Sequence, residues 1–135
     1  MTAKTELVHK IGGAILRRAN ADGEDWDYAG WVFKTLDGSS ASGELFRYRG
    51  QTRLVLDMSS DQRTTSDAFF RLREITVGDD GKPWIKCLVA VRREDKALRM
   101  YFEFEDASRW SISPANVEDA RQILLGQAFP EVEET

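Results

Sequence analysis

The sequence predicts a single α+β domain in which an antiparallel sheet of about five strands is covered by helices. Three observations support this fold class. Long stretches repeat apolar residues at helical spacing, short aromatic and β-branched stretches alternate in polarity, and brief turn-forming sequences join them. A chain of 135 residues, 41% hydrophobic, is enough for one domain with a core, expected over residues 1–130. The predicted order is α-β-β-β-α-β-β-α, with the helices on one face and a more solvent-exposed second face.

The first helix is expected over residues 5–20, where apolar residues recur every three or four positions. Thr5 is the expected N-cap, and basic residues near the end suit the negative end of the helix dipole. Gly12 and Gly13 each weaken a helix by about 1 kcal/mol relative to alanine. They indicate either close packing against the sheet or an irregular helix.

Strands are expected at residues 28–36, 43–49, 52–58, 84–92 and 97–105. The connections "DGSSAS", "GQ" and "REDK" are short and turn-like, so neighbouring strands are expected to pair antiparallel.

Two more helices complete the predicted order. One is expected over residues 61–77, ending at Gly78. The other lies in "ISPANVEDARQILLG", where Ser113 is the expected cap, Pro114 suits the first helical position and Gly126 ends the helix. Residues 131–135 are expected to form a disordered acidic tail.

Charge and composition argue against several function classes. The 19 Lys and Arg residues against 23 Asp and Glu residues give a net charge of −4, with no clustered basic face for nucleic acid. No apolar run has the length of a membrane span or a signal peptide, so we expect a cytoplasmic protein without a membrane partner. The single cysteine, Cys87, sits in "WIKCLVAV" and is expected to be a small buried hydrophobe.

Catalytic, metal and cofactor sites are not expected. The single histidine, His9, has no nucleophile at helical spacing, and the acidic stretch "ADGEDWD" lacks the ligand spacing of a calcium loop. Glycine-rich stretches such as "IGGAIL" lack the pattern of a phosphate-binding loop. We therefore expect a protein that is not an enzyme.

The stretch "RMYFEFED" alternates between two faces of an extended strand. Met100, Phe102 and Phe104 are expected in the core. The opposite row is open to three interpretations, namely a carboxylate pair for glycoside hydrolysis, a partner contact or an ordinary solvated face. With two acids from the loop before the first strand, the predicted partner-binding residues are Tyr101, Glu103, Glu105, Asp25 and Asp27.

A family resemblance appears over residues 62–126. The helix end "FFRLREITVG", the turn "DDGKPW", the alternating "MYFEFED" and the terminal "SP…LLG" together resemble the YezG-like immunity proteins. The resemblance implies an antitoxin that binds and neutralises a polymorphic bacterial toxin, often a nuclease. Acidic and aromatic groups on a rigid sheet suit such a basic partner.

Two other readings stay open. The element order also resembles type III secretion chaperones, which are homodimers that hold an extended effector segment. The third interpretation is a small-molecule binding domain or enzyme with a pocket between the helices and the sheet.

Overall fold

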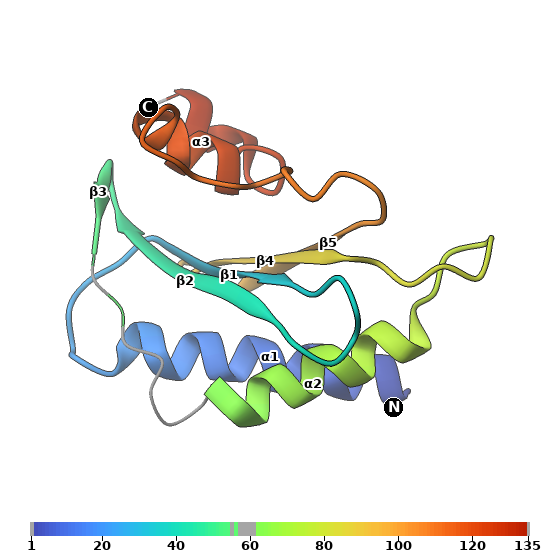
Figure 1. Ribbon diagram of the computed structural model, residues 1–135. Helices are drawn as coiled ribbons and strands as arrows, with labels where there is room; N and C mark the ends of the chain where they lie inside the picture. Colours follow the sequence, from blue (N-terminus) through green and yellow to red (C-terminus); the bar gives the residue numbers. More distant parts are fainter. Residues whose placement is uncertain (1, 55, 57–61, 135) are drawn as a thin grey trace.

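One antiparallel sheet of five strands lies at the centre of the computed structural model, which describes residues 2–54, 56 and 62–134 (Figure 1). The order across the sheet is β3-β2-β1-β4-β5. The strands are β1 Tyr28–Lys34, β2 Ser42–Arg49, β3 Thr52–Arg53, β4 Lys86–Arg92 and β5 Ala97–Glu103. Every neighbouring pair is antiparallel, which confirms the predicted fold class.

Helices cover both faces of the sheet. α1 (Ala3–Asn20) and α2 (Gln62–Ile75) lie along one face, here called the α1 face (Figure 1). α3 (Ala120–Leu125), with the 3-10 turns η1 (Val117–Asp119) and η2 (Pro130–Glu134), covers the opposite α3 face. The expectation of helices on one face only is therefore wrong, because the C-terminal segment packs on the second face.

α1 begins earlier than the sequence indicates, since Thr2 and not Thr5 is its N-cap. The Thr2 Oγ1 accepts the Thr5 N–H at 3.1 Å. Gly12 is buried, and a Cβ at that position would lie 2.6 Å from Leu98 Cδ1 of β5. Close packing against the sheet is thus the reason for a glycine at position 12.

Stacked aromatic rings dominate the core on the α1 face. Phe33 of β1 stacks on Phe69 of α2 with ring centroids 4.4 Å apart. Trp84, just before β4, stacks on Phe102 of β5 at 5.5 Å. Cys87 is fully buried in the same cluster, as expected, and burial raises the pKa of its thiol.

The core on the α3 face joins the sheet to the C-terminal segment. Tyr28 of β1 packs on Phe129 with ring centroids 5.3 Å apart. Leu124 and Leu125 of α3 are buried in the same cluster as Leu88 of β4. The two cores share the sheet, so its central strands β1 and β4 are buried on both sides.

Boundaries differ most in the third strand and the last helix. β3 has two residues, and residues 55 and 57–58 of the predicted strand lie outside the described part of the chain. The predicted cap at Ser113 is wrong, because α3 starts at Ala120 after a 3-10 turn. The Asn116 side chain accepts the Ser113 N–H and donates to Ser111 O, and these side-chain bonds turn the backbone away from a helix.

The chain end also differs from the disordered tail that the sequence predicts. Pro130–Glu134 forms a 3-10 turn in which Val132 is buried. The Glu131 carboxylate accepts hydrogen bonds from the Tyr28 hydroxyl and the Arg92 guanidinium, both at 2.7 Å.

Alternation along β5 is as expected up to Glu103. Leu98, Met100 and Phe102 pack against the α1-face core, and Tyr101 packs on the α3 face. The prediction that Phe104 belongs to the core is wrong, because β5 ends one residue earlier and Phe104 is 36% exposed. Within the described residues, no helix combines the length and the hydropathy needed to cross a bilayer.

Candidate functional site

The five predicted partner-binding residues lie at two opposite ends of the sheet. Asp25 and Asp27 precede β1, whose first residue lies in one row with Arg92 and Ala97. Glu103 lies six residues further along β5, which corresponds to about 20 Å of extended strand. The two groups of carboxylates therefore do not form one site.

Tyr101 and Glu103 are held by contacts within the protein. The Tyr101 hydroxyl donates to Gln127 O at 3.4 Å, and its ring is half-buried under the C-terminal segment. The Glu103 carboxylate accepts the N–H groups of Glu105 and Asp106 and a hydrogen bond from the Arg109 guanidinium, at 2.9 to 3.1 Å. These amides, with Arg109, lower the Glu103 pKa to about 2. Glu103 organises the turn after β5.

That turn exposes Phe104 and Glu105 at the end of the sheet. A Cβ on Gly78 would lie 3.4 Å from the Phe104 ring and 3.3 Å from Asp80 Oδ1. The ring thus stands against the loop between α2 and β4, where Val77 is 51% exposed.

We call this surface the Phe104 patch and define it as Val77, Asp79, Asp80, Phe104 and Glu105. Its three carboxylates are exposed, and Lys82 is an exposed basic side chain in the same loop. The patch therefore combines two exposed apolar side chains with an excess of negative charge. Contiguous exposed apolar surface rimmed by polar groups is a feature of interaction sites.

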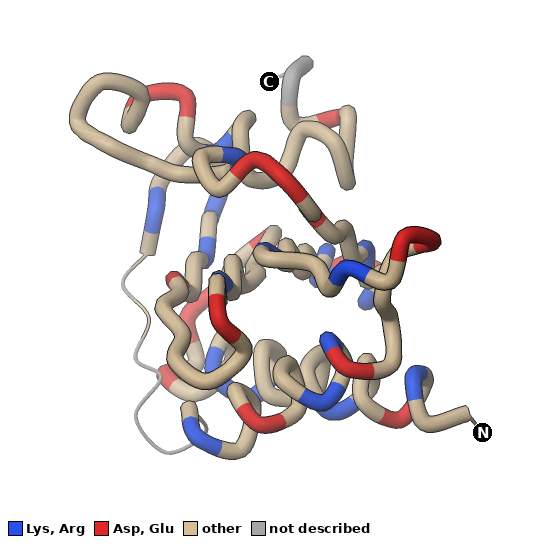
Figure 2. Tube along the Cα trace, turned by 45° about the vertical axis from the view of Figure 1, so that its right-hand side comes forward, with Lys and Arg blue, Asp and Glu red and all other residues tan. Residues whose placement is uncertain are grey.

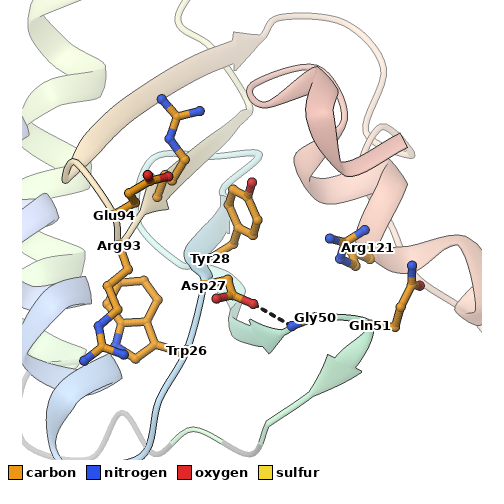
Figure 3. Close-up of a pocket in the computed structure, with 9 residues that line it drawn as sticks. Trp26, Asp27, Tyr28, Gly50, Gln51, Arg93, Glu94 and Arg121 are labelled. Carbon is orange, nitrogen blue, oxygen red and sulfur yellow. Dashed lines mark hydrogen bonds between the residues drawn. The ribbon is translucent and has the colours of Figure 1, made fainter. Parts of the chain in front are cut away.

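The opposite end of the sheet carries a cavity of about 620 Å³ (Figure 3). Its lining residues are Trp26, Asp27, Tyr28, Gly50, Gln51, Arg92, Arg93, Glu94 and Arg121. Figure 3 shows Arg121 and Gln51 on one side of the cavity, across from Tyr28 and Asp27. The Asp27 carboxylate accepts the Gly50 N–H at 2.6 Å, which joins the start of β1 to the turn between β2 and β3.

Charged groups around this cavity are largely paired with one another. Arg92 makes a two-bond ion pair with Asp95 and donates to Glu131, so the pKa of Arg92 is raised, first by Asp95 and then by Glu131. The Arg93 guanidinium forms an ion pair with the exposed Asp25 carboxylate, with Nη1 and Oδ1 3.1 Å apart. Burial and the hydrogen bond to Glu131 raise the pKa of Tyr28 to about 12. The cavity is a mixed-charge recess whose polar groups mostly hold the fold.

The described residues contain no cluster of metal-ligating side chains. Among them, no three His, Cys, Asp or Glu side chains come close enough to hold a metal ion. His9 is exposed on α1. Figure 2 shows Lys and Arg residues interspersed with Asp and Glu residues over the whole trace. The residues of the Phe104 patch provide exposed carboxylates and apolar groups at the end of a well-packed sheet.

The chain matches no protein-family model, and a search of the curated proteins finds no match.

The exposure of Phe104 at one end of the sheet and the cavity at the other end were not predicted from the sequence. Phe104 continues the alternating pattern, and only the turn made by Glu103 brings it to the surface. The cavity brings together residues that are far apart in the chain, and Arg92 in its wall bonds to Glu131, 39 residues away. The signal for Phe104 was the run of polar residues that follows it, "EDAS", which is typical of a strand end.

Proposed function

We propose that the protein is a non-catalytic immunity protein that binds and neutralises a polymorphic bacterial toxin through the Phe104 patch. The observation that carries this proposal is an exposed aromatic ring set among exposed carboxylates at the end of a sheet that is packed on both faces. The occupant that fits this chemistry is a basic protein surface with an apolar pocket for the ring.

Association with such a partner would use two separate physical effects. Aromatic anchors contribute most of the binding energy when a pocket on the partner removes them from water. The carboxylates of Asp79, Asp80 and Glu105 would attract a basic partner from a distance and raise the association rate. Complementary charge of this kind suits a toxin with a basic cleft, such as a nuclease.

The frame around Phe104 lowers the cost of ordering the patch on binding. Gly78 and Lys82 close the adjacent loop through an N–H to carbonyl bond of 2.8 Å. The Glu103 carboxylate fixes the turn that presents Phe104 and Glu105. Groups that are already ordered lose less conformational entropy when a partner binds.

The resemblance of residues 62–126 to the YezG-like immunity proteins supports the same function. Inhibition by occlusion requires no catalytic residue in the inhibitor, only a surface that fits the partner. The chaperone alternative has no observation of its own in the described structure.

The test uses the reading frame next to the gene, which should encode a large protein with a C-terminal toxin module. Co-expression of this chain should restore growth, and the purified proteins should form a stable complex. Phe104→Ala should weaken binding by about tenfold to a hundredfold, as for a buried aromatic anchor, and Glu105→Lys should slow association.

Asp25→Lys is the matched control, because it reverses an exposed carboxylate at the opposite end of the sheet. Its affinity should equal that of the unaltered protein. Normal affinity in both Phe104→Ala and Glu105→Lys would contradict the assigned surface. Absence of both rescue and complex would remove the immunity function, and a homodimer under those conditions would favour the chaperone alternative.

A further inference from the structure

Two lysines face each other at one end of the α3 face, remote from the large cavity. Lys34 ends β1 and Lys86 begins β4, and the two are direct partners in the register of the sheet. Both side chains lie on the α3 face, since Val32 and Leu88, two residues away on each strand, belong to its core. Like charges directly opposite one another in a sheet are destabilising.

Lys86 is almost completely buried, at 3% exposure. Its ammonium group donates to Ala107 O at 2.9 Å, to Arg109 O at 2.6 Å and to Ser111 Oγ at 2.8 Å. All three protons have acceptors, yet none of these acceptors carries a charge. Burial, and then the Lys34 charge, lowers the pKa of Lys86, while Asp106 acts in the opposite direction.

Lys34 is half-buried, and among the described residues its ammonium group has no hydrogen-bond or ion-pair partner. Two positive charges therefore lie side by side without a bound carboxylate. A buried charge without a counter-charge costs free energy, so a site of this kind favours an anion.

A cavity of about 290 Å³ opens between these lysines and the loop before η1. Its polar lining includes Ser42, which pairs with Lys34 in the sheet, and Ser111, which accepts a hydrogen bond from Lys86; Trp110 forms part of its wall. Ser111 Oγ accepts from Lys86, which leaves its own proton to donate to a ligand. Glu44 also lines the cavity, but its carboxylate is paired with Arg53.

We propose that this cavity binds a small oxyanion with two negative charges, namely a phosphate group, between Lys34 and Ser111. Lys34 donates directly to the anion, while Lys86 supplies the second positive charge and holds the loop that carries Ser111. A dianion matches the two ammonium charges, whereas a carboxylate leaves one of them uncompensated. The lining of this cavity shares no residue with the Phe104 patch, although both lie at the end of the sheet where Lys86 pairs with Glu103.

The test is a titration with inorganic phosphate at constant ionic strength, followed through the backbone amides by nuclear magnetic resonance. Saturable shifts are expected at residues 34, 42 and 111. Lys34→Gln should weaken binding by about tenfold or more, because it removes a charged donor, and Ser111→Ala should weaken it to a smaller degree. Lys86 is not substituted, since its loss would release the loop at 107–111.

Lys10→Gln is the matched control, an exposed lysine of α1 on the other side of the sheet, and it should bind phosphate as the unaltered chain does. Methyl phosphate and acetate complete the design. Binding of methyl phosphate as tight as that of phosphate would show that a phosphate monoester also fits. Equal affinity for acetate would overturn the dianion assignment. Unsaturable shifts, or unchanged binding in Lys34→Gln, would overturn the site itself.

Discussion

Arg47 and Asp22 form a two-bond ion pair, with guanidinium to carboxylate distances of 2.8 and 2.9 Å, that joins the middle of β2 to the loop after α1. Arg47 is 1% exposed, and it also donates to Ala19 O at 2.8 Å, so it satisfies a carbonyl at the end of α1. One side chain thereby connects the sheet, the helix end and the acidic loop.

The first prediction concerns the pH dependence of this pair. The hydrogen bonds from Arg47, followed by the Glu24 amide, hold the pKa of Asp22 well below its ordinary value of 3.8. A lowered carboxyl pKa stabilises the fold above that ordinary value, and the contribution is lost as pH falls further. Asp22→Asn should reduce the free energy of unfolding at pH 7, and the difference from the unaltered protein should shrink below about pH 4. Urea unfolding at several pH values measures it, and a difference independent of pH would contradict the role of the charge.

A pair of glycines tests the packing of α1 on the sheet. Gly13→Ala should stabilise the protein by about 0.5–1 kcal/mol through helix propensity, because the new Cβ meets only Arg17 Nη1 at an ordinary 3.5 Å. Gly12→Ala makes the same chemical change but places its Cβ 2.6 Å from Leu98 Cδ1, so Leu98 must move. We expect Gly12→Ala to gain less stability than Gly13→Ala or to lose some. Equal gains in urea unfolding would contradict the close approach of α1 to β5.

Local periodicity predicted the sheet well, because the alternation of apolar and polar residues that marks a strand can be recognised from neighbouring residues alone. The alternation in β5 placed Met100 and Phe102 correctly, since each strand residue points to the face opposite its neighbour. The same alternation wrongly placed Phe104 in the core. The hydrogen bonds to the Glu103 side chain end the strand before Phe104, although the alternation in the sequence continues. Periodicity shows that a segment has an apolar side but not which face of the sheet it covers. The position of α3 was therefore beyond sequence reasoning, as was the grouping of charges at two ends.

The chain end provides a third prediction, because the sequence predicts a disordered tail where Val132 is buried and Glu131 is bonded. Truncation after Pro130 should lower the free energy of unfolding by about 2 kcal/mol or more, through lost apolar burial and lost hydrogen bonds to Tyr28 and Arg92. Truncation after Val132 is the comparison, because it keeps Glu131 and Val132, and it should leave the more stable of the two shortened chains. Equal stability of the two shortened chains would contradict the packing of the C-terminal turn.

Substitution of a single hydrogen-bonding group tests the same contact without shortening the chain. Tyr28→Phe keeps the ring against Phe129 but removes the hydroxyl that donates to Glu131. The loss should be about 1 kcal/mol, the usual contribution of one such hydrogen bond. Chemical denaturation measures it, and Tyr101→Phe is the comparison, because its hydroxyl makes only a long contact of 3.4 Å. An equal loss in both variants would contradict a specific role for the Tyr28 hydroxyl.

Glu103 and Glu105 provide the last prediction, because they are two residues apart and differ in what they do. Glu103→Gln should destabilise the protein at pH 7, since the Asp106 and Glu105 amides and Arg109 all bind its charged form. These contacts lower the pKa of Glu103 to about 2, so its contribution should be complete above about pH 5 and decline between about pH 4.5 and 2. Glu105→Gln, by contrast, should leave stability at pH 7 unchanged, because the Glu105 side chain is exposed beyond the end of β5. Thermal unfolding at pH 7 and pH 3 distinguishes the two carboxylates. If Glu105→Gln were the destabilising substitution, the turn would not be organised by Glu103, and the exposure of Phe104 would lose its structural explanation.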